Sequence, residues 1–365
     1  MNKNLKEGFT TGSAAAAAAK AGTAFLLGGG QSKEVDIPLP GQGRLTIPVS
    51  AYQPLNANTV CVTVIKDAGD DPDVTHGAEI ECLVEVFREK RSEEIILRGG
   101  KGVGIVTLPG LAVPVGEAAI NPEPRKQIRA AVQEALDQAG SGAAVNVTVQ
   151  VPRGLELARK TMNPRLGIKD GISILGTRGT VKPFSHEAYA ASIALALDVA
   201  KAQGADAVAL STGRAAERFL RRDLPELEGK AFIPIADYFA FSLREAAKKG
   251  LKTIILGCFF GKLVKMAQGA AYTHAKEAVI DFEALADWCL DAGLAEERAS
   301  AIRGANTARQ ALEIILQAPD PQPILLAVTS KALDSAQGFA GPGPGIEYRV
   351  YGFDGAALCR VQGGN

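Results

Sequence analysis

The first half of the chain alternates apolar and polar positions in short runs rich in β-branched residues, a pattern typical of half-buried strands. We expect strands at Val35–Ile37, Arg44–Ile47, Thr59–Ile65, Ile80–Phe87, Glu94–Leu97 and Ala144–Val151. Two longer segments favour helices, Ala14–Leu27 and Pro124–Ala139. Many strands with few helices indicate an α+β layered domain over residues 1–180.

The pattern changes near Gly176–Pro183, after which helices alternate with short apolar strands. We expect helices at His186–Gln203 and Ala236–Lys249, and strands at Ala207–Leu210, Thr253–Leu256 and Pro323–Val328. Short apolar strands between helices are typical of a parallel sheet that helices cover on both faces. The sequence therefore predicts a Rossmann-like α/β domain with a mainly parallel sheet over residues 181–365.

Composition narrows the class of protein. The 40 basic and 40 acidic residues give a formal net charge of zero, which argues against a nucleic-acid or membrane-surface partner. No run is long and apolar enough to suggest a membrane helix. The five cysteines are scattered without a CxxC pair, which favours reduced thiols in a cytoplasmic protein and argues against a structural zinc site. The oligomeric state is left open, and a homo-oligomer is one alternative.

The junction near the start combines a polar glycine loop with an alanine-rich helix. Gly8-Phe9-Thr10-Thr11-Gly12-Ser13 is followed by six alanines and Lys20. The first amides of a helix lack internal partners and favour anions, so the loop can form a cradle for a carboxylate-rich ligand. Its candidate substrate-binding residues are Thr10, Thr11, Gly12, Ser13 and Lys20. The alternative is an ordinary N-cap, Thr11 or Ser13, on a buried helix.

An acidic loop follows the strand that we expect at Thr59–Ile65. It carries four aspartates and a histidine, of which Asp67, Asp70, Asp71 and His76 are candidate catalytic residues. Loops after strands often carry function. The alternative is a loop whose aspartates bond to local amides, and we prefer that interpretation to metal binding.

Three basic residues in or near glycine-rich turns are further candidates for substrate binding. Lys101 lies in Arg98–Gly104, which resembles a phosphate loop but lacks GK[ST] and leads into a strand. Arg165 and Arg178 lie near the expected domain junction, where either could clamp a carboxylate with its planar fork. A hairpin for Lys101 and surface ion pairs for the arginines are the alternatives.

Two turns in the second half follow predicted strands and open helices, where open α/β sheets bind ligands. The first contributes Ser211, Thr212 and Gly213, and the second Gly257, Gly261 and Lys262. His274, after the helix that begins at Lys262, is either functional or a satisfied polar residue.

Taken together, these segments resemble the cobalt-precorrin-5B C1-methyltransferase family of anaerobic cobalamin biosynthesis. The resemblance extends from Gly8 to about His274. It rests on GFTTGS with its alanines and lysine, VIKDAGDDPDVTHG, GGKGVGIVTLPGL, VGEAAINPEPRKQI, NPRLGI, GISILGTRGTV, and GKLVKMAQG followed by TH. Ala14, Cys258-Phe259-Phe260 and Tyr272 depart from the family pattern, in which a cysteine commonly follows TTGS and an asparagine precedes Thr-His.

The resemblance implies that the protein transfers a methyl group from S-adenosylmethionine to C1 of cobalt-precorrin-5B, giving cobalt-precorrin-6A. Cobalt then arrives inside the substrate, and no metal site is expected in the protein. We place the donor at the two turns of the second domain together with His274, and the substrate's carboxylates at the cradle and the basic residues. The alanines would let the flat macrocycle lie against the helix, and an aspartate of the acidic loop would accept a proton or stabilise the sulfonium.

Two other functions stay open from the sequence. One is a non-catalytic tetrapyrrole carrier or scaffold that contacts neighbouring enzymes of the pathway. The other is an enzyme of central metabolism that binds a carboxylate or phosphate with a different cofactor.

Overall fold

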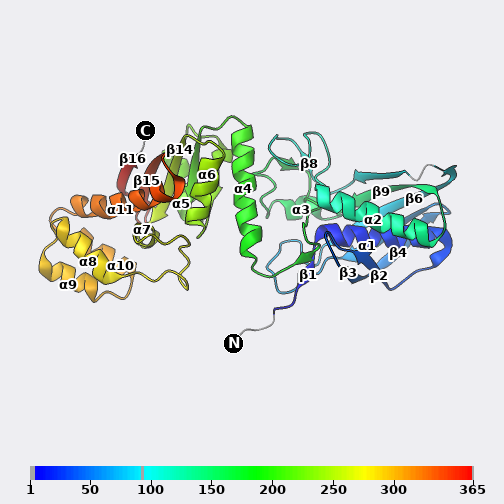
Figure 1. Ribbon diagram of the computed structural model, residues 1–365, viewed down its shortest axis with the longest axis horizontal. Helices are drawn as coiled ribbons and strands as arrows, with labels where there is room; N and C mark the ends of the chain where they lie inside the picture. Colours follow the sequence, from blue (N-terminus) through cyan, green and yellow to red (C-terminus); the bar gives the residue numbers. More distant parts are fainter. Residues whose placement is uncertain (1–4, 92–93, 364–365) are drawn as a thin grey trace. The chain divides into compact units, whose positions relative to one another are not determined.

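A computed structural model describes residues 5–91 and 94–363 of the chain. The chain divides into two units, Met1–Ser185 (unit 1) and His186–Asn365 (unit 2), each with its own five-stranded sheet (Figure 1). Both sheets combine parallel and antiparallel neighbours, so the fold is mixed α/β.

The sheet of unit 1 is mainly antiparallel. Its strand order is β4 (Ala51–Asn56), β5 (Thr59–Ile65), β6 (Glu79–Arg91), β9 (Ala143–Gln150) and β7 (Ile95–Gly99), and only β7 and β9 pair in parallel. Along β5, Val60, Val62 and Val64 are fully buried and the residues between them are partly exposed. This alternation gives the sheet one buried face, as its sequence pattern predicts.

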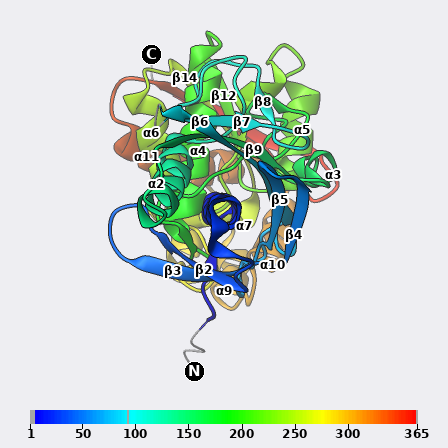
Figure 2. The same ribbon diagram turned by 90° about the vertical axis from the view of Figure 1, so that its right-hand side faces the viewer.

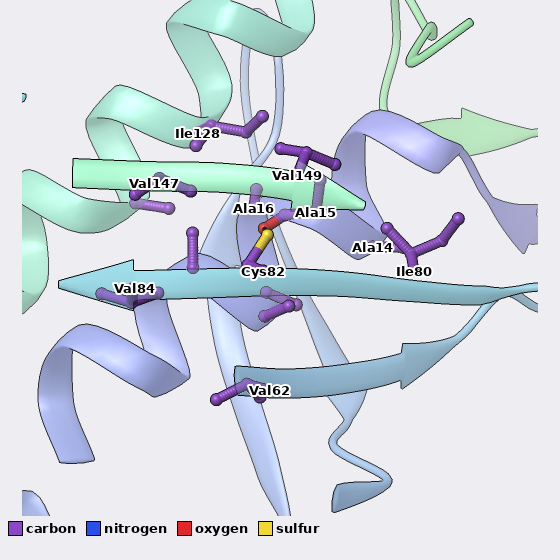
Figure 3. Packing of buried hydrophobic residues seen from close by; sticks show 14 of the residues in the cluster. Ala14, Ala15, Ala16, Val62, Ile80, Cys82, Val84, Ile128, Val147 and Val149 are labelled. Carbon is purple, nitrogen blue, oxygen red and sulfur yellow. Dashed lines mark hydrogen bonds between the residues drawn. The ribbon is translucent and has the colours of Figure 1, made fainter. Parts of the chain in front are cut away.

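Helix α1 (Thr11–Ala24), which continues into the π-helical turn η1 (Phe25–Gly29), lies inside unit 1. It packs against β5 and β6 on one side and against α2 (Pro122–Gln138) on another, as Figures 2 and 3 show. Methyl side chains let the strands come close: Cys82 Sγ lies 3.3 Å from the Ala15 carbonyl oxygen (Figure 3), and a Cβ on Gly22 would lie 2.8 Å from Val84. Every residue of α1 from Thr11 to Thr23 is buried, so α1 is a core helix.

Short elements complete unit 1. They are the strand pairs β1 (Gly8–Phe9) with β11 (Thr180–Val181), β2 (Glu34–Pro38) with β3 (Arg44–Pro48), and β8 (Ile105–Val106) with β10 (Ile168–Lys169), and the helix α3 (Gly154–Ala158). The first pair joins the segment before α1 to the last residues of the unit.

The sheet of unit 2 has the order β13 (Phe232–Pro234), β12 (Ala207–Ser211), β14 (Thr253–Phe259), β15 (Gly345–Tyr351) and β16 (Ala357–Gly363). The first four strands are parallel and β16 is antiparallel. Helices cover both faces: a Cβ on Gly257 would meet Leu220 of α5 (Arg214–Asp223), whereas Tyr348, the register partner of Leu256, donates a hydrogen bond to the Ala332 carbonyl of α11 (Gln322–Ala340).

The other helices of unit 2 precede or follow its strands. They are α4 (His186–Ala202), the short 3₁₀ helix η2 (Gly229–Ala231), α6 (Phe239–Lys248), α7 (Phe260–Ala267), α8 (Phe282–Asp291), α9 (Glu296–Arg303) and α10 (Ala308–Leu316). Within the described ranges, none of the helices of either unit is both long and apolar enough to span a bilayer.

The strand expected at Pro323–Val328 is wrong, because this segment is the first part of α11. Ile324, Val328 and Ala332 are buried and recur every four residues, which is the helical repeat. The six residues of the predicted strand are too few to show this repeat. The sheet instead contains β13, β15 and β16, none of which the pattern analysis identified.

Candidate functional site

The polar groups at the start of α1 bond to the protein itself. Thr10 is the N-cap, and its Oγ1 accepts a hydrogen bond from the Ser13 amide. Thr11 Oγ1 accepts from the Leu175 amide at 2.9 Å, and Ser13 Oγ donates to the Gly179 carbonyl at 2.7 Å. The Gly12 amide donates to the Leu175 carbonyl, and a Cβ on Gly12 would lie 2.9 Å from Pro124. These groups hold the loop 173–179, and their side chains are buried.

The rest of α1 is equally internal. The six alanines have no exposed surface, so the expectation that a macrocycle lies against them is wrong: strands and α2 already cover the helix. Lys20 is buried, and its Nζ donates to Glu134 Oε2 at 2.5 Å and to the Asp36 carbonyl at 2.8 Å. The structure thus places Lys20 between α2 and β2.

Each acidic residue of the predicted catalytic loop anchors a segment of unit 1. Asp67 Oδ2 accepts from Lys6 Nζ at 2.6 Å, and this hydrogen bond and the amide of Gly69 hold the pKa of the Asp67 carboxyl below its ordinary value. Asp70 Oδ2 accepts from the Lys6 amide, and Asp71 Oδ1 accepts from the Phe184 amide.

His76 and the deepest ion pair belong to the same loop. His76 Nδ1 accepts from the Ala68 amide at 3.1 Å. Lys66, whose side chain is 1% exposed, pairs with Asp73 at 2.6 Å. Burial raises the pKa of Asp73, but Lys66 and Thr75 outweigh it and the net shift is downward. Across residues 5–91 and 94–363, no three His, Cys, Asp or Glu side chains are grouped to hold a metal ion.

The three basic candidates are exposed on unit 1, at the tips of loops that pack together. Lys101, Arg165 and Arg178 are exposed. A Cβ on Gly102 (φ +74°) would lie 1.9 Å from the Val151 carbonyl oxygen, and one on Gly171 would lie 2.2 Å from the Gly102 carbonyl oxygen. The glycines therefore serve close contact between backbones, and they bring the turn that carries Lys101 against the loop that leads to Arg178.

In unit 2 the predicted ligand turns meet at one edge of the sheet. The parallel strands lie side by side in the order β13, β12, β14, β15. The chain therefore leaves β12 towards β13 on one side and leaves β14 towards β15 on the other, so these two connections run in opposite directions. Open α/β sheets bind ligands at the carboxyl ends of two such strands. Ser211 and Gly257 are register partners there, and α5 and α7 begin just beyond them.

Ser211 is the most informative residue of this edge. It is fully buried, and its Oγ has no hydrogen-bond partner among the described residues. It points to the sheet face that α5 covers, because its register partner Gly257 faces Leu220. An unpaired buried hydroxyl costs about 1–3 kcal/mol, so it needs a reason such as a bound ligand.

The glycines of the two turns have different surroundings. Gly213, the N-cap of α5, has no atom within 4 Å of where a Cβ would lie. Gly257 is required for packing, because its Cβ would lie 2.4 Å from Leu220. A Cβ on Gly261 would lie 3.3 Å from the Cβ of Ala308. The open space is therefore at Gly213, and Thr212 beside it donates its amide to the Gly257 carbonyl.

A charged network crosses the end of β12. Asp237 follows β13, and Lys262 lies in α7, which follows β14. Lys262 bonds to Asp237, and because β12 lies between β13 and β14, this bond passes over the end of β12. Thr273 Oγ1 donates to Asp237 Oδ1 at 3.0 Å, and Lys262 and Lys265 both donate to the Thr273 carbonyl. Burial and then Lys265 lower the pKa of Lys262 to about 8, a shift that the nearby Asp237 opposes. Ala236, just before Asp237, has φ +48°, a strained value of the kind found at functional sites.

Sequence reasoning assigned no binding role to four of the five aromatic residues beside this network. His186, Tyr189, Tyr238, Tyr272 and His274 form a connected group of rings, named here the tyrosine–histidine cluster. His274 was a candidate, and the structure places it against Tyr272, with its Nδ1 accepting from the Lys276 amide. The one sequence feature that could have drawn attention to these residues is how rare they are. The chain has six tyrosines and three histidines, and three tyrosines and two histidines meet here.

Two family models match separate parts of the chain. The model described as CbiD matches residues 1–183, and the model described as CbiD, C-terminal domain, matches residues 272–362. The chain belongs to the CbiD family. The first match alone covers half of the chain.

Curated relatives in the CbiD family agree over nearly the whole length. A protein from Nitratidesulfovibrio vulgaris is 48% identical over 97% of this chain and 92% of its own length, and one from a Geobacillus species is 45% identical over 98% and 97%. Both are named cobalt-precorrin-5B C(1)-methyltransferase. The family predicted from the motifs is therefore confirmed.

A solved structure is also similar, the crystal structure of a cobalamin biosynthesis protein (cbiD) from Archaeoglobus fulgidus. It is 29% identical, with a TM-score of 0.39, and the match covers 70% of this chain and 78% of that chain.

Proposed function

We propose that the protein methylates C1 of cobalt-precorrin-5B to give cobalt-precorrin-6A in anaerobic cobalamin biosynthesis, with S-adenosylmethionine as the donor. The observation that carries this proposal is the near full-length similarity to relatives with that name, which are 48% and 45% identical. The substrate brings its own cobalt, and the cytoplasm is the proposed place of action. We also propose that residues 1–180 form a layered α+β domain and residues 181–365 a Rossmann-like domain.

The residues at the carboxyl edge of β12 and β14 fit the donor. The unpaired Ser211 hydroxyl can bond a polar group of the nucleoside or amino acid portion, and Gly213 leaves room at the start of α5. The two turns also contain Thr212, Gly257, Gly261 and Lys262. His274 stacks on the ring of Tyr272. S-adenosylmethionine supplies a methyl group on a positively charged sulfur, which is electrophilic without further activation.

On unit 1, the exposed Lys101, Arg165 and Arg178 are the proposed partners of the substrate's carboxylates. Thr10, Thr11, Gly12 and Ser13 act indirectly, because they hold the loop that carries Arg178. Lys20 fixes α2 in the same way.

The chemistry asks little of acids and bases, so positioning of the two reactants is the main proposed source of rate. Asp67, Asp70 and Asp71 are engaged with Lys6 and Phe184, which supports a role in holding the chain together. His76 is exposed, and it is the proposed acceptor if a proton must leave the substrate.

The test is anaerobic incubation with enzymatically made cobalt-precorrin-5B and methyl-deuterated S-adenosylmethionine, followed by mass spectrometry of the corrinoid. We expect one labelled methyl group on the product, and none without the protein. No label beside an active family member would contradict the proposal, and tight corrinoid binding without transfer would support a carrier instead.

A further inference from the structure

The tyrosine–histidine cluster is a continuous group of rings built from three separate segments of unit 2. Tyr189 and Tyr238 stack with centroids 5.0 Å apart and planes 13° apart, and Tyr272 meets Tyr238 edge-on at 5.0 Å. His186 contacts Tyr238 and Tyr272 at 5.9 and 5.3 Å, and His274 stacks on Tyr272 at 6.0 Å. Because these rings stack on one another or meet at an angle, they form one packed aromatic surface of ring edges and outer faces.

This surface lies at the ligand-binding edge of the sheet. Tyr238 follows Asp237 after β13, and Tyr272 precedes Thr273 after α7, so the cluster borders the network that crosses the end of β12. His186 and Tyr189 come from the first turn of α4. A reactant that receives a methyl group from a donor at Ser211 must approach this same edge.

Exposed rings and a nearby lysine favour a conjugated ligand with carboxylates. Tyr189 is 38% exposed, His186 is exposed, and the other three rings are half-buried. Lys262 pairs with Asp237, and Glu277 adds a carboxylate near Tyr238. Lys265 donates to the Thr273 carbonyl, so its positive charge has no direct carboxylate partner among the described residues. The exposed rings of His186 and Tyr189 are the parts of the cluster that a ligand can contact. A conjugated macrocycle with carboxylate arms matches both these rings and the nearby lysine.

A second aromatic group of unit 2 lies on the sheet face that α5 covers. Phe259 and Phe353 stack at 5.0 Å, and Phe219, on α5, meets Phe259 edge-on at 6.3 Å. Phe353 is 65% exposed and Arg309 lies over its ring. Since Ser211 also points to the α5 face, this second group lies on the donor's side, and it provides a matched control.

We infer that the tyrosine–histidine cluster binds the ring face of the tetrapyrrole substrate, with Lys265 attracting its carboxylates. The inference rests on the proposed function for the identity of the ligand. It assigns Tyr189, the most exposed of the three tyrosines, the largest share of new contact with the macrocycle.

The test is a spectrophotometric titration of the full chain with hydrogenobyrinic acid, a cobalt-free corrinoid that keeps its carboxylates and carries no axial ligand on either ring face. Tyr189→Ala should raise the Kd about 5- to 10-fold, because one aromatic contact is lost, while Tyr189→Phe keeps the ring and should bind about as wild type. Tyr189→Leu keeps apolar bulk without a ring and should resemble Tyr189→Ala. Phe353→Ala is the exposed aromatic control and should leave the corrinoid Kd unchanged.

A parallel titration with S-adenosylhomocysteine separates the two ligands. We expect Tyr189→Ala and Tyr189→Leu to bind it as wild type. Wild-type corrinoid affinity in both variants, or weakened binding of S-adenosylhomocysteine alone, would overturn the inference, as would a wild-type chain that does not bind the corrinoid. If the chain binds the corrinoid in a Tyr189-dependent way but transfers no methyl group, the proposed function is contradicted and the inference about the cluster is supported.

Discussion

The start of α1 in unit 1 and the end of β12 in unit 2 have similar sequences and different chemistry. Both are hydroxyl- and glycine-bearing turns that open a helix. In unit 1 the Thr11 and Ser13 hydroxyls bond to the loop 173–179, and the side chains are buried. In unit 2 the buried Ser211 hydroxyl finds no partner among the described residues, and Gly213 faces open space.

We therefore take a helix-opening polar turn as a candidate ligand site only where its polar groups lack partners in the protein. The same contrast holds for the charged residues. The Lys66–Asp73 pair lies in a loop that folds on itself, whereas the Lys262–Asp237 pair joins two strand ends beside the strained Ala236. In unit 1 these polar groups are therefore paired within the protein, whereas in unit 2 the Ser211 hydroxyl is left unpaired, as the proposed donor site requires.

The largest effect that sharpens this comparison is expected for Asp73→Ala. It leaves the Lys66 ammonium buried without its carboxylate, which should cost unit 1 about 3–5 kcal/mol of unfolding free energy. Trp288 in α8 is the one tryptophan of the chain, so its fluorescence reports unit 2. In urea, circular dichroism should show an early transition while the Trp288 midpoint stays in place.

Asp70→Asn is the matched control, since Asp70 is exposed and its partner is the Lys6 amide. It should change the unfolding free energy by less than about 1 kcal/mol. If the Trp288 midpoint fell together with the dichroism in Asp73→Ala, the two units would unfold as one body.

A smaller effect is expected for Ser211→Ala, which removes a hydroxyl that no described protein group binds. Its unfolding free energy should equal or exceed that of wild type, and its Kd for S-adenosylhomocysteine should rise about fivefold through loss of one hydrogen bond. Calorimetric titration and urea unfolding measure the two quantities.

Ser242→Ala provides the reverse case, because this buried hydroxyl donates to the Tyr238 carbonyl at 2.6 Å. It should lose about 1 kcal/mol of stability and keep its affinity for S-adenosylhomocysteine. Equal losses of affinity in both variants would break the proposed distinction between bonded and unbonded serines.

The smallest effect is a pH dependence in unit 1. Arg44, more than Lys20, lowers the pKa of Glu134 from 4.5 to about 2. A lowered carboxyl pKa gives stability that is complete above pH 4.5 and is lost as the pH falls towards 2. Urea unfolding at a series of pH values should show this loss in wild type and a flatter profile in Glu134→Gln. Parallel profiles would contradict the role given to Glu134.

Regular alternation made the strands of unit 1 predictable. The run Thr59–Ile65 is confirmed as β5 with the same bounds, and the helix expected at Pro124–Ala139 is α2, shifted by one or two residues. The strand prediction at Pro323–Val328 was wrong, because a run of six apolar residues is equally typical of a buried helix and of a buried strand. β13 has three residues and is too short to leave a pattern.

The candidate site was predictable where it depends on local sequence and not where it depends on long-range contacts. The turns at Ser211 and Gly257 follow strands, and that much can be read from the chain. The bond between Asp71 and the Phe184 amide joins positions 113 residues apart, and the tyrosine–histidine cluster joins segments near 186, 238 and 272. Such pairings depend on tertiary packing, which periodicity does not encode.

The most direct test of this division between the units is hydrogen–deuterium exchange, measured by mass spectrometry with and without saturating S-adenosylhomocysteine. The account predicts slower exchange in peptides that cover residues 209–216 and 257–264, at the ends of β12 and β14. Peptides that cover residues 8–20 and 66–77 should exchange at unchanged rates. Protection at the start of α1 or in the acidic loop, with none at the ends of β12 and β14, would contradict it.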